Sequence, residues 1–388
     1  MTTIGIEQLL AEPPSFLAGQ RLALLCNQAS TDRHFRHSRD LLMQAFPGQL
    51  VCLFSPQHGF FSEKQDNMIE SSHSTDADSG LPVFSLYGET RQPTAAMFDG
   101  FDILLIDLQD VGTRVYTFIW TVVYCLQQAA ASGKKVLLLD RPNPVGGQIV
   151  EGNLLRPELR SFVGLHEIPM RHGLTMGELA LLCNQEMSIE ADLEVLRMQG
   201  WQREMFFAET GFPWVFPSPN MPTPLTALVY PGQVLWEGTN ISEGRGTTLP
   251  FELVGAPFIR PQEVLRLVGK TELPGCLLRP LLFEPTSGKW AGQPCAGFQV
   301  HVTEPQRFRA YRLSLFLLKA LLQLHPQEFA WKQPPYEYEY EKLPIDLILG
   351  DQKLRKALES GADIMELEQT WQEELAAFEE RRQAVLLY

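Results

Sequence analysis

Hydrophobic runs in the first half of the chain each stop in a cluster of polar residues. Residues 103–106 are uninterruptedly apolar, and their leucine and β-branched content over so short a stretch predicts a buried strand. Polar side chains crowd the end of this strand, together with a glycine that lets the backbone turn sharply: Asp107, Gln109, Asp110, Gly112, Thr113, Arg114 and Tyr116.

The same pattern occurs three more times, at the apolar runs 21–26, 50–54 and 135–139, with helix-like segments between them. Strands that alternate with helices indicate an α/β fold with a doubly wound parallel sheet. Parallel strands all point the same way, so their polar ends meet at one edge of the sheet, where such folds bind ligands. The three further clusters are Asn27, Gln28 and Ser30; Ser55, Gln57 and His58; and Asp140, Arg141 and Asn143.

Each of these residues also has an ordinary structural explanation. Asp107 or Asp110 can cap the following helix and pair with Arg114, and a single histidine such as His58 is as often a structural hydrogen-bonding group as a proton donor. A structural role of this kind can explain any single residue, but it does not explain why polar residues gather at the ends of all four strands. We therefore interpret the four clusters as one shared site.

A polar stretch without helical or strand periodicity, residues 60–80, follows Gln57 and His58 directly. Loops of this length inside compact domains are usually functional or mobile, so we interpret the stretch as a lid over the site. Further along, Arg171 and His172 precede a helix that begins with a capping box, where an anion is favoured. These two residues either line the cleft or close the first domain.

The character of the chain changes after residue 214, where proline, glycine and polar residues become dense but aromatic residues persist. Such a segment is more typical of an ordered crossing between domains than of a loose linker. We expect an N-terminal domain at 1–228 and a smaller α+β domain at 229–388. A second polar cluster begins at Trp236 and contains Glu237, Asn240, Glu243 and Arg245.

The last part of the chain shows no recognisable chemistry. Residues 298–302 alternate as a half-buried strand, and 311–324 carry the apolar stripe of a helix. The alternating tyrosines and glutamates of 336–342 indicate a solvated edge strand or an extended segment. Residues 346–360 and 364–387 each read as one helix.

Composition limits the possible partners. The 388 residues suffice for two domains, and 45% hydrophobic and 20% charged residues are typical of a globular protein. The net charge of -14 argues against nucleic acid as a partner, although a few arginines can still hold an anionic small molecule. No segment has the length of a membrane span, so we expect no membrane partner.

Known cofactor and targeting motifs are missing from the sequence. Neither a phosphate-binding GxxxxGK[ST] loop nor a GxGxxG after the first strand occurs, and neither HExxH nor zinc-type spacing is found, so we expect no cofactor and no metal. The N-terminus lacks the features of a secretory signal, and the six cysteines show no CxxC spacing. We therefore expect a cytoplasmic protein with reduced thiols.

Long motifs in the order of the chain resemble the NamZ-type exo-β-N-acetylmuramidase family, formerly a domain of unknown function. The likeness covers nearly the whole chain and rests on SLYGETRQPT, DLQDVGTRVYT, DRPNPVGG with VEGN, FVGLHEIPMRHGLTMGEL, WVFPSPNMPT, LVYPG and WEGTNISEGRGTTLPFELVGAP. The resemblance implies a Rossmann-like N-terminal domain, a smaller C-terminal domain and an active-site cleft between them. It also implies hydrolysis of a terminal N-acetylmuramic acid from peptidoglycan fragments, without a nucleotide cofactor.

One position departs from the family. Where the family typically has Pro-Glu-His-Gly, with the glutamate as the implied catalytic carboxylate, this chain has Gln57 before His58. An amide cannot transfer a proton as a carboxyl group does, and glycoside hydrolysis usually needs two carboxyl groups. Either another acid has replaced it, or His58 is the acid, or the activity is lost or changed. The candidate replacement acids are Glu63, Glu70, Glu89 and Asp110.

Three hypotheses follow. The first is a glycosidase on muramic acid or a related amino sugar, with Asp107, Asp110 or Glu237 as partner carboxylate and Arg114, Arg141 or Arg245 holding the acidic substituent of the sugar. The second is an enzyme of the same fold with another sugar or ester as substrate, and the third is a carbohydrate-binding protein without turnover. The remaining expected substrate-binding residues are Asn27, Tyr116, Asn143, His172, Asn220, Asn240 and Glu243.

Overall fold

The computed structural model describes residues 2–64, 68–269 and 273–388. Its largest sheet has seven strands in the order β3-β4-β2-β1-β5-β6-β9, and all neighbours are parallel except β3 and β4. The six parallel strands follow the order typical of Rossmann folds, so the predicted doubly wound sheet is confirmed. The strands are β1 (Leu22–Cys26), β2 (Leu50–Ser55), β3 (Ser74–Thr75), β4 (Pro82–Ser85), β5 (Ile103–Asp107), β6 (Lys135–Leu139) and β9 (Leu193–Leu196).

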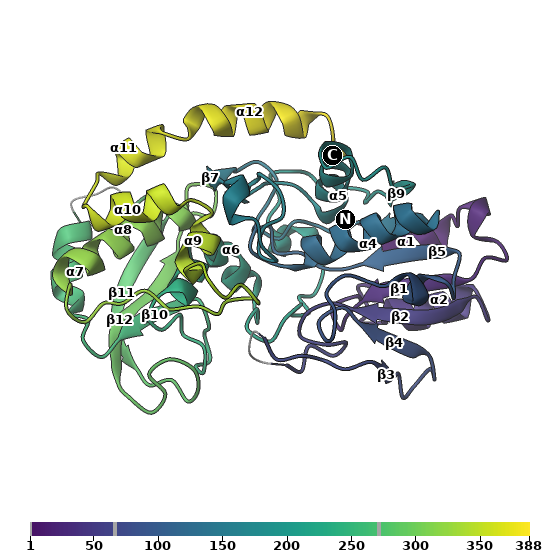
Figure 1. Cartoon of the computed structure of the whole chain (residues 1–388), viewed down its shortest axis with the longest axis horizontal. Helices are drawn as coiled ribbons and strands as arrows, with labels where there is room; N and C mark the ends of the chain where they lie inside the picture. Colours follow the sequence, from purple (N-terminus) through teal and green to yellow (C-terminus); the bar gives the residue numbers. More distant parts are fainter. Residues whose placement is uncertain (1, 65–67, 270–272) are drawn as a thin grey trace.

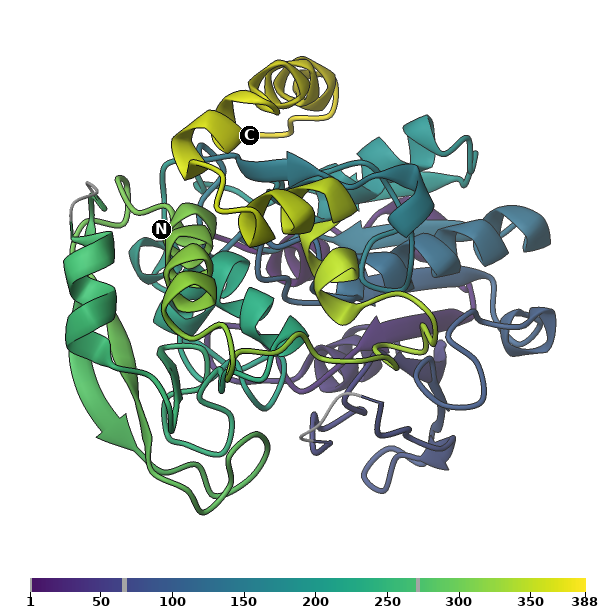
Figure 2. The ribbon, with the colours of Figure 1, turned by 60° about the vertical axis from the view of Figure 1, so that its left-hand side comes forward.

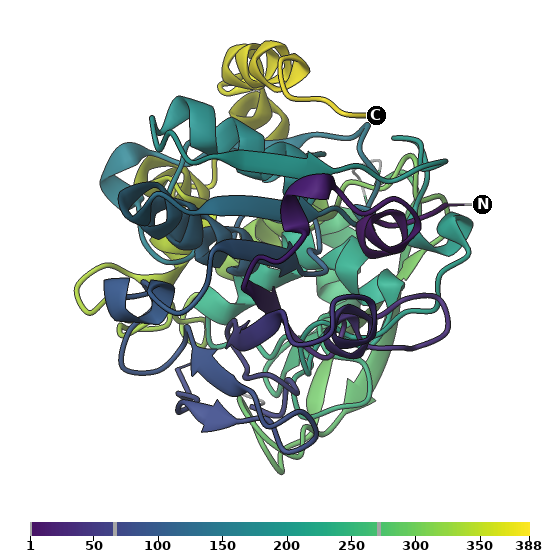
Figure 3. The same ribbon diagram turned by 90° about the vertical axis from the view of Figure 1, so that its right-hand side faces the viewer.

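Helices cover both faces of this sheet (Figures 1 and 3). Leu24 and Leu105 pack with α1 (Gly5–Ala11) and α2 (Ser38–Ala45) on one face, while alternate residues pack with α4 and α5 on the other. The strands are apolar throughout because neither face meets water. The other elements of this region are η1 (Ser15–Leu17), α3 (Ala95–Phe98), α4 (Phe118–Ser132), the antiparallel pair β7 (Glu151–Leu154) and β8 (Pro169–Arg171), η2 (Pro157–Leu159), α5 (Met176–Glu186) and η3 (Phe207–Thr210).

A smaller antiparallel sheet in the order β10-β12-β11 organises the rest of the chain. The strand predicted at 298–302 and the helix predicted at 311–324 are confirmed within β12 and α8. The two sheets define an N-terminal part and a C-terminal part, which lie side by side (Figure 1). The C-terminal part contains α6 (Pro224–Gln233), η4 (Val234–Gly238), β10 (Leu253–Ala256), α7 (Pro261–Val268), β11 (Cys276–Phe283), β12 (Cys295–Val302) and α8 (Ala310–Leu324).

The end of the chain differs from expectation. The two long helices predicted there are each broken in two, giving α9 (Pro344–Leu349), α10 (Gln352–Glu359), α11 (Ile364–Gln369) and α12 (Gln372–Gln383). Gly350 ends α9 in the left-handed conformation, and the side chain of Asp351 caps α10. In the part of the chain that the structure describes, no helix combines the length and the apolar character that crossing a membrane requires.

The prediction of a solvated edge strand or an extended segment at 336–342 was wrong for residues 336–339. Tyr336 and Glu337 are each only 4% exposed, and the backbone makes a tight turn that bridges Tyr336 and Glu339. Glu337 and Tyr338 have positive φ angles of 46° and 66°, which lie outside the β region that regular strand residues occupy. Figure 2 shows this yellow-green segment between α8 and α9 reaching toward the N-terminal part.

The chain finally returns to the N-terminal part through α11 and α12, seen in yellow in Figure 1. The hydroxyl of the last residue, Tyr388, donates to Asp140 Oδ2 at 2.7 Å and accepts from the backbone N–H of Met198 at 2.9 Å. Burial raises the pKa of Asp140 to about 6 against the hydrogen bonds that it accepts. The C-terminus therefore fastens the two parts together at the edge of the large sheet.

Arg114 makes a second connection between the two parts. Its guanidinium is fully buried and donates to four backbone carbonyls, those of Asn153 and Ile168 in the N-terminal part and of Ile348 and Leu349 in α9. Burial lowers the pKa of Arg114 to about 10. The side chain therefore fixes the position of α9 against the N-terminal part.

We expect Arg114→Met to destabilise the fold by about 3 kcal/mol or more, because it leaves several buried carbonyls without donors. Chemical denaturation of the variant and of the parent measures this loss. Arg21→Met is the matched control, since the Arg21 side chain is 53% exposed and its ion pair with Asp102 should contribute little. Equal losses in the two variants would contradict the assignment.

Candidate active site

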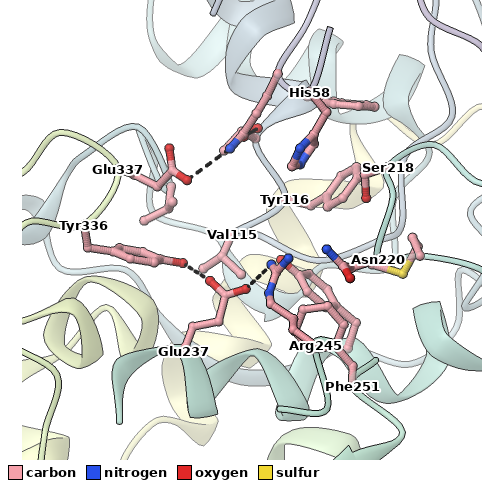
Figure 4. A pocket seen from close by; sticks show the side chains of 16 residues that line it. His58, Val115, Tyr116, Ser218, Asn220, Glu237, Arg245, Phe251, Tyr336 and Glu337 are labelled. Atoms are coloured by element: carbon pink, nitrogen blue, oxygen red, sulfur yellow. Dashed lines mark hydrogen bonds and ion pairs between the residues drawn. The ribbon is translucent and has the colours of Figure 1, made fainter. Parts of the chain in front are cut away.

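A pocket of about 460 Å³, part of it open to solvent, lies between the two parts of the chain (Figure 4). On one side it is formed by the segments that follow β2 and β5, at the carboxyl edge of the large sheet. This edge, next to the reversal of strand order, is where doubly wound folds bind ligands. The lining residues are Gln57, His58, Val115, Tyr116, Thr117, Phe118, Val163, Ser218, Asn220, Met221, Tyr230, Glu237, Arg245, Phe251, Tyr336 and Glu337.

Gln57 is held in one orientation by two neighbours. The hydroxyl of Thr117 donates to its amide oxygen at 2.5 Å, and its amide nitrogen donates to Glu337 Oε1 at 3.0 Å. Because both ends of the amide are engaged, the nitrogen faces the carboxylate. Gln57 has no ionisable proton, so it contributes hydrogen bonds to the site and no acid.

His58 is a neutral hydrogen-bond acceptor in this site. Its Nδ1 lies 2.7 Å from the carbonyl oxygen of Lys64, which can only accept, so Nδ1 carries the proton and Nε2 is bare. Burial lowers the pKa of His58 to about 4. The imidazolium form, which a proton donor needs, is therefore scarce at neutral pH. The residue also has a φ of 74°, a strained backbone conformation of the kind that clusters at functional sites.

Glu237, on η4, is the ionised carboxylate of the pocket. It accepts from Arg245 Nη2 at 2.6 Å and from the Tyr336 hydroxyl at 2.7 Å. Burial acts to raise the pKa of Glu237, but the charge and hydrogen bond of Arg245, with the Tyr336 bond, outweigh it and leave the pKa below its ordinary value. Glu243 lies behind this pair, 3.3 Å from Arg245 Nε.

Glu337 is in the opposite situation. It accepts hydrogen bonds from Gln57 and from the Tyr87 hydroxyl at 2.6 Å, and burial raises the pKa of its carboxyl to about 7. Figure 4 shows Glu237 and Glu337 entering the pocket from the C-terminal part, with His58 and Tyr116 across from them. Two carboxyl groups whose pKa values are pushed apart by their surroundings are the arrangement that acid and base catalysis uses.

Six of the predicted site residues line this pocket, and the others lie outside it. The six are Gln57, His58, Tyr116, Asn220, Glu237 and Arg245. Asp107 and Arg141 instead form a bidentate ion pair at the sheet edge, with Nε to Oδ1 at 2.5 Å and Nη2 to Oδ2 at 2.8 Å. Ser38 donates a further hydrogen bond to Asp107.

The three predicted asparagines outside the pocket hold loops in place. Asn27 donates to the carbonyl of Pro217 at 2.9 Å, just before the segment that lines the pocket. Asn143 donates to the carbonyl of Leu174, and Asn240 to that of Glu328.

The remaining predicted residues are also engaged elsewhere. Asp110 Oδ2 accepts from the N–H of Gly112 at 2.7 Å and lies 3.6 Å from Nε2 of the buried His172. Glu243 pairs with Lys289 at 2.7 Å, and Arg114 joins the two parts as described above.

None of the three glutamates considered as replacement acids lines the pocket. Glu63, Glu70 and Glu89 are all exposed. Residues 65–67 of the predicted lid lie outside the described residues. On either side of them, the carbonyl of Lys64 contacts His58, and the N–H of Met68 donates to the Tyr87 hydroxyl at 2.9 Å.

The sequence interpretation missed Glu337, Tyr336, Thr117 and Tyr87. Glu337 and Tyr336 occur in the run 336–342, in which tyrosine and glutamate alternate as apolar and polar residues do in a surface strand. Only the tertiary fold buries them. Thr117 ends a motif that was noticed for its other residues. Within the described residues, no group of three or more His, Cys, Asp or Glu is arranged to hold a metal ion.

The fold and the pocket define a two-part α/β protein with a Rossmann-type sheet and an acidic cleft at its carboxyl edge. Comparison with known proteins identifies its family. The model of the N-terminal domain of "Exo-beta-N-acetylmuramidase NamZ" matches residues 22–225, and that of the C-terminal domain matches residues 228–388. The chain therefore belongs to the NamZ family.

Individual relatives agree with this membership. The peptidoglycan β-N-acetylmuramidase NamZ of Bacillus subtilis (strain 168) is 41% identical over 384 residues, which cover 99% of this chain and 91% of that protein. Two solved structures of DUF1343 family proteins from Bacteroides fragilis NCTC 9343 match with TM-scores of 0.89 and 0.78, at 30% and 29% identity. Each match covers 100% of this chain and 99% of the other.

The state of His58 provides a direct test of the pocket geometry. We expect nitrogen NMR of histidine-labelled protein to show His58 as the Nδ1–H tautomer, with a pKa of about 4, because of its burial and its bond to Lys64. The spectrum of His58→Asn assigns the resonance by its disappearance. An Nε2–H tautomer, or titration in the ordinary range of histidine, would contradict the geometry.

Proposed function

We propose that this protein is an exo-acting glycosidase that removes a non-reducing terminal N-acetylmuramic acid, or a related amino sugar, from peptidoglycan fragments. The observation that carries the proposal is the pair Glu237 and Glu337, two carboxyl groups in one pocket with pKa values shifted in opposite directions. Glycoside hydrolysis usually requires one carboxyl group to be protonated and one ionised. The activity in the name of the Bacillus subtilis relative supports the same reaction.

The pocket also has groups suited to an acidic amino sugar. Among the predicted arginines, Arg245 alone lines it, beside Asn220 and Tyr116. The lactyl group of muramic acid carries a carboxylate, and a charge-assisted bond from an arginine is a strong way to recognise it.

The wider arrangement belongs to the same proposal. We place the division between an N-terminal domain and a C-terminal domain at residues 228 and 229, within α6, with the active-site cleft between the domains. We also place the protein in the cytoplasm, acting on imported fragments, because its six cysteines are free and five of them are buried.

Turnover of aryl glycosides tests the function. We expect the protein to hydrolyse para-nitrophenyl N-acetylmuraminide and to prefer it to the N-acetylglucosaminide, which lacks the lactyl carboxylate. Arg245→Met should lower this preference in kcat/KM by about tenfold or more, the size of one lost charge-assisted hydrogen bond.

Arg279→Met, at an exposed position on β11, should leave the preference unchanged. Hydrolysis of another sugar or of an ester, with no turnover of muraminides, would indicate an enzyme of the same fold with a different substrate. Binding of N-acetylmuramic acid without turnover of any glycoside would indicate a carbohydrate-binding protein.

A further inference from the structure

The hydrogen bond between Gln57 and Glu337 joins residues 280 positions apart in the sequence and spans the pocket from one part of the chain to the other. We propose that Glu337 is the group that protonates the leaving oxygen of the glycoside in this protein, with Gln57 positioning it. This inference rests on the proposed glycosidase function and assigns its acid.

The geometry places the carboxyl group of Glu337 directly beside the amide of Gln57 in the pocket. The amide nitrogen of Gln57 lies 3.0 Å from Glu337 Oε1. The carboxyl group of Glu337 therefore lies within one hydrogen-bond length of the side chain at position 57. Thr117 fixes the amide so that its donor side faces Glu337, and Tyr87 holds the other carboxyl oxygen at 2.6 Å.

The other carboxyl group and the imidazole that line the pocket, those of Glu237 and His58, are unsuited to donate a proton. Glu237 is paired with Arg245 at 2.6 Å and is kept ionised by it. Burial keeps the His58 ring neutral, and its one N–H group donates a hydrogen bond to the carbonyl of Lys64. Glu337 remains as the carboxyl group that the pocket leaves protonated up to about neutral pH.

The charged and titratable groups around Glu337 act in both directions. Burial raises its pKa most, and the negative charge of Glu237 adds to this effect. The hydrogen bonds from Tyr87 and Gln57 and the positive charge of Arg91 lower it, and the result is a pKa of about 7. Tyr230 and Tyr336 also face this group, and both stay protonated because burial raises their pKa values well above the ordinary value.

The backbone around Glu337 is strained. Glu337 and Tyr338 both have φ in the left-handed region, at 46° and 66°, which costs energy for residues with large side chains. The ring of Tyr338 lies under the Arg91 guanidinium at 3.3 Å and packs on Tyr87, which secures this conformation. In this conformation the Glu337 side chain is buried, at 4% exposure, and does not point into solvent as it would on a surface strand.

In the step itself, the Glu337 carboxyl proton passes to the glycosidic oxygen as the bond from that oxygen to the anomeric carbon breaks. The electron pair of the broken bond stays on the leaving oxygen. Water then supplies the hydroxyl group of the anomeric carbon, and its remaining proton restores the carboxyl group of Glu337. The protonated form is the active one, so activity should fall as the pH rises through about 7.

The dependence on leaving group distinguishes a proton donor from a merely structural residue. We expect Glu337→Gln to lower kcat by about a hundredfold or more on a disaccharide with N-acetylmuramic acid at its non-reducing end, whose leaving alcohol needs a proton. On a dinitrophenyl glycoside, whose leaving group needs no proton, the same variant should lose less than about tenfold. Glu341→Gln, exposed in the same run, is the matched control and should behave as the parent.

Equal losses on both substrates, or near-parental activity on the disaccharide, would overturn the assignment while leaving the glycosidase function intact. The parent could instead hydrolyse another glycoside but no muraminide. If Glu337→Gln then lowered kcat mainly on substrates whose leaving group needs a proton, the proposed substrate would be refuted and the assignment of Glu337 supported. A parent that hydrolyses no glycoside at all would refute both.

The pH dependence of kcat offers a second readout, in variants that retain Glu337. Tyr87→Phe removes a donor that stabilises the ionised form, so the alkaline limb of kcat should move to higher pH. Gln57→Glu places a second carboxyl group against Glu337, and repulsion between like charges should move the limb the same way. An inactive parent that gains activity through Gln57→Glu would show instead that position 57 alone can supply the acid.

Discussion

The contact between Gln57 and Glu337 is the interaction on which the site depends. It forms only when the C-terminal part of the chain is folded against the N-terminal part, because the two residues come from different parts. The same approach of the two parts buries Glu337 and raises the pKa of its carboxyl group to about 7. Acid strength in this pocket is therefore a property of the assembled chain and not of either sheet alone.

The rest of the structure holds the two parts in that position. Arg114 ties α9 to the N-terminal part through four backbone carbonyls, and Tyr388 fastens the end of the chain onto Asp140. Arg114 and Asp140 are both fully buried, so breaking either anchor would leave a buried polar group short of hydrogen-bond partners. The polar clusters of the sequence thus divide into groups that face the pocket, such as Glu237, and groups that fix the surrounding structure, such as Arg114.

The fold of the N-terminal part could be predicted well because its signals are local. Uninterrupted apolar runs such as residues 103–106 specify strands covered on both faces, and the polar residues after them mark the carboxyl edge of the sheet. The same reasoning could not tell pocket residues from anchors. Asp107, Arg114 and Arg141 all lie at or beyond the end of a strand, and all three are buried outside the pocket. Whether such a residue lines the pocket, pairs with a charge or binds a backbone carbonyl depends on packing between distant segments.

Glu337 shows this limit most clearly. Its neighbours alternate like those of a surface strand. Nothing in the local sequence indicates that Glu337 and Tyr338 adopt left-handed conformations, or that Glu337 contacts Gln57, a residue 280 positions away in the sequence. A run of mixed tyrosine and glutamate residues near a chain end is weak evidence for a site until the fold is known. Gln57 was recognisable as a site residue in the sequence, whereas its carboxyl partner Glu337 was not.

The titration of the two pocket carboxyl groups tests the account most directly. NMR of the ligand-free protein, with isotope-labelled glutamate and with Glu237→Gln and Glu337→Gln to assign the signals, measures both. We expect Glu337 to titrate at about 7 while Glu237 is already ionised well below that pH. Titration of Glu337 near the ordinary glutamate value of about 4.3 would contradict the account.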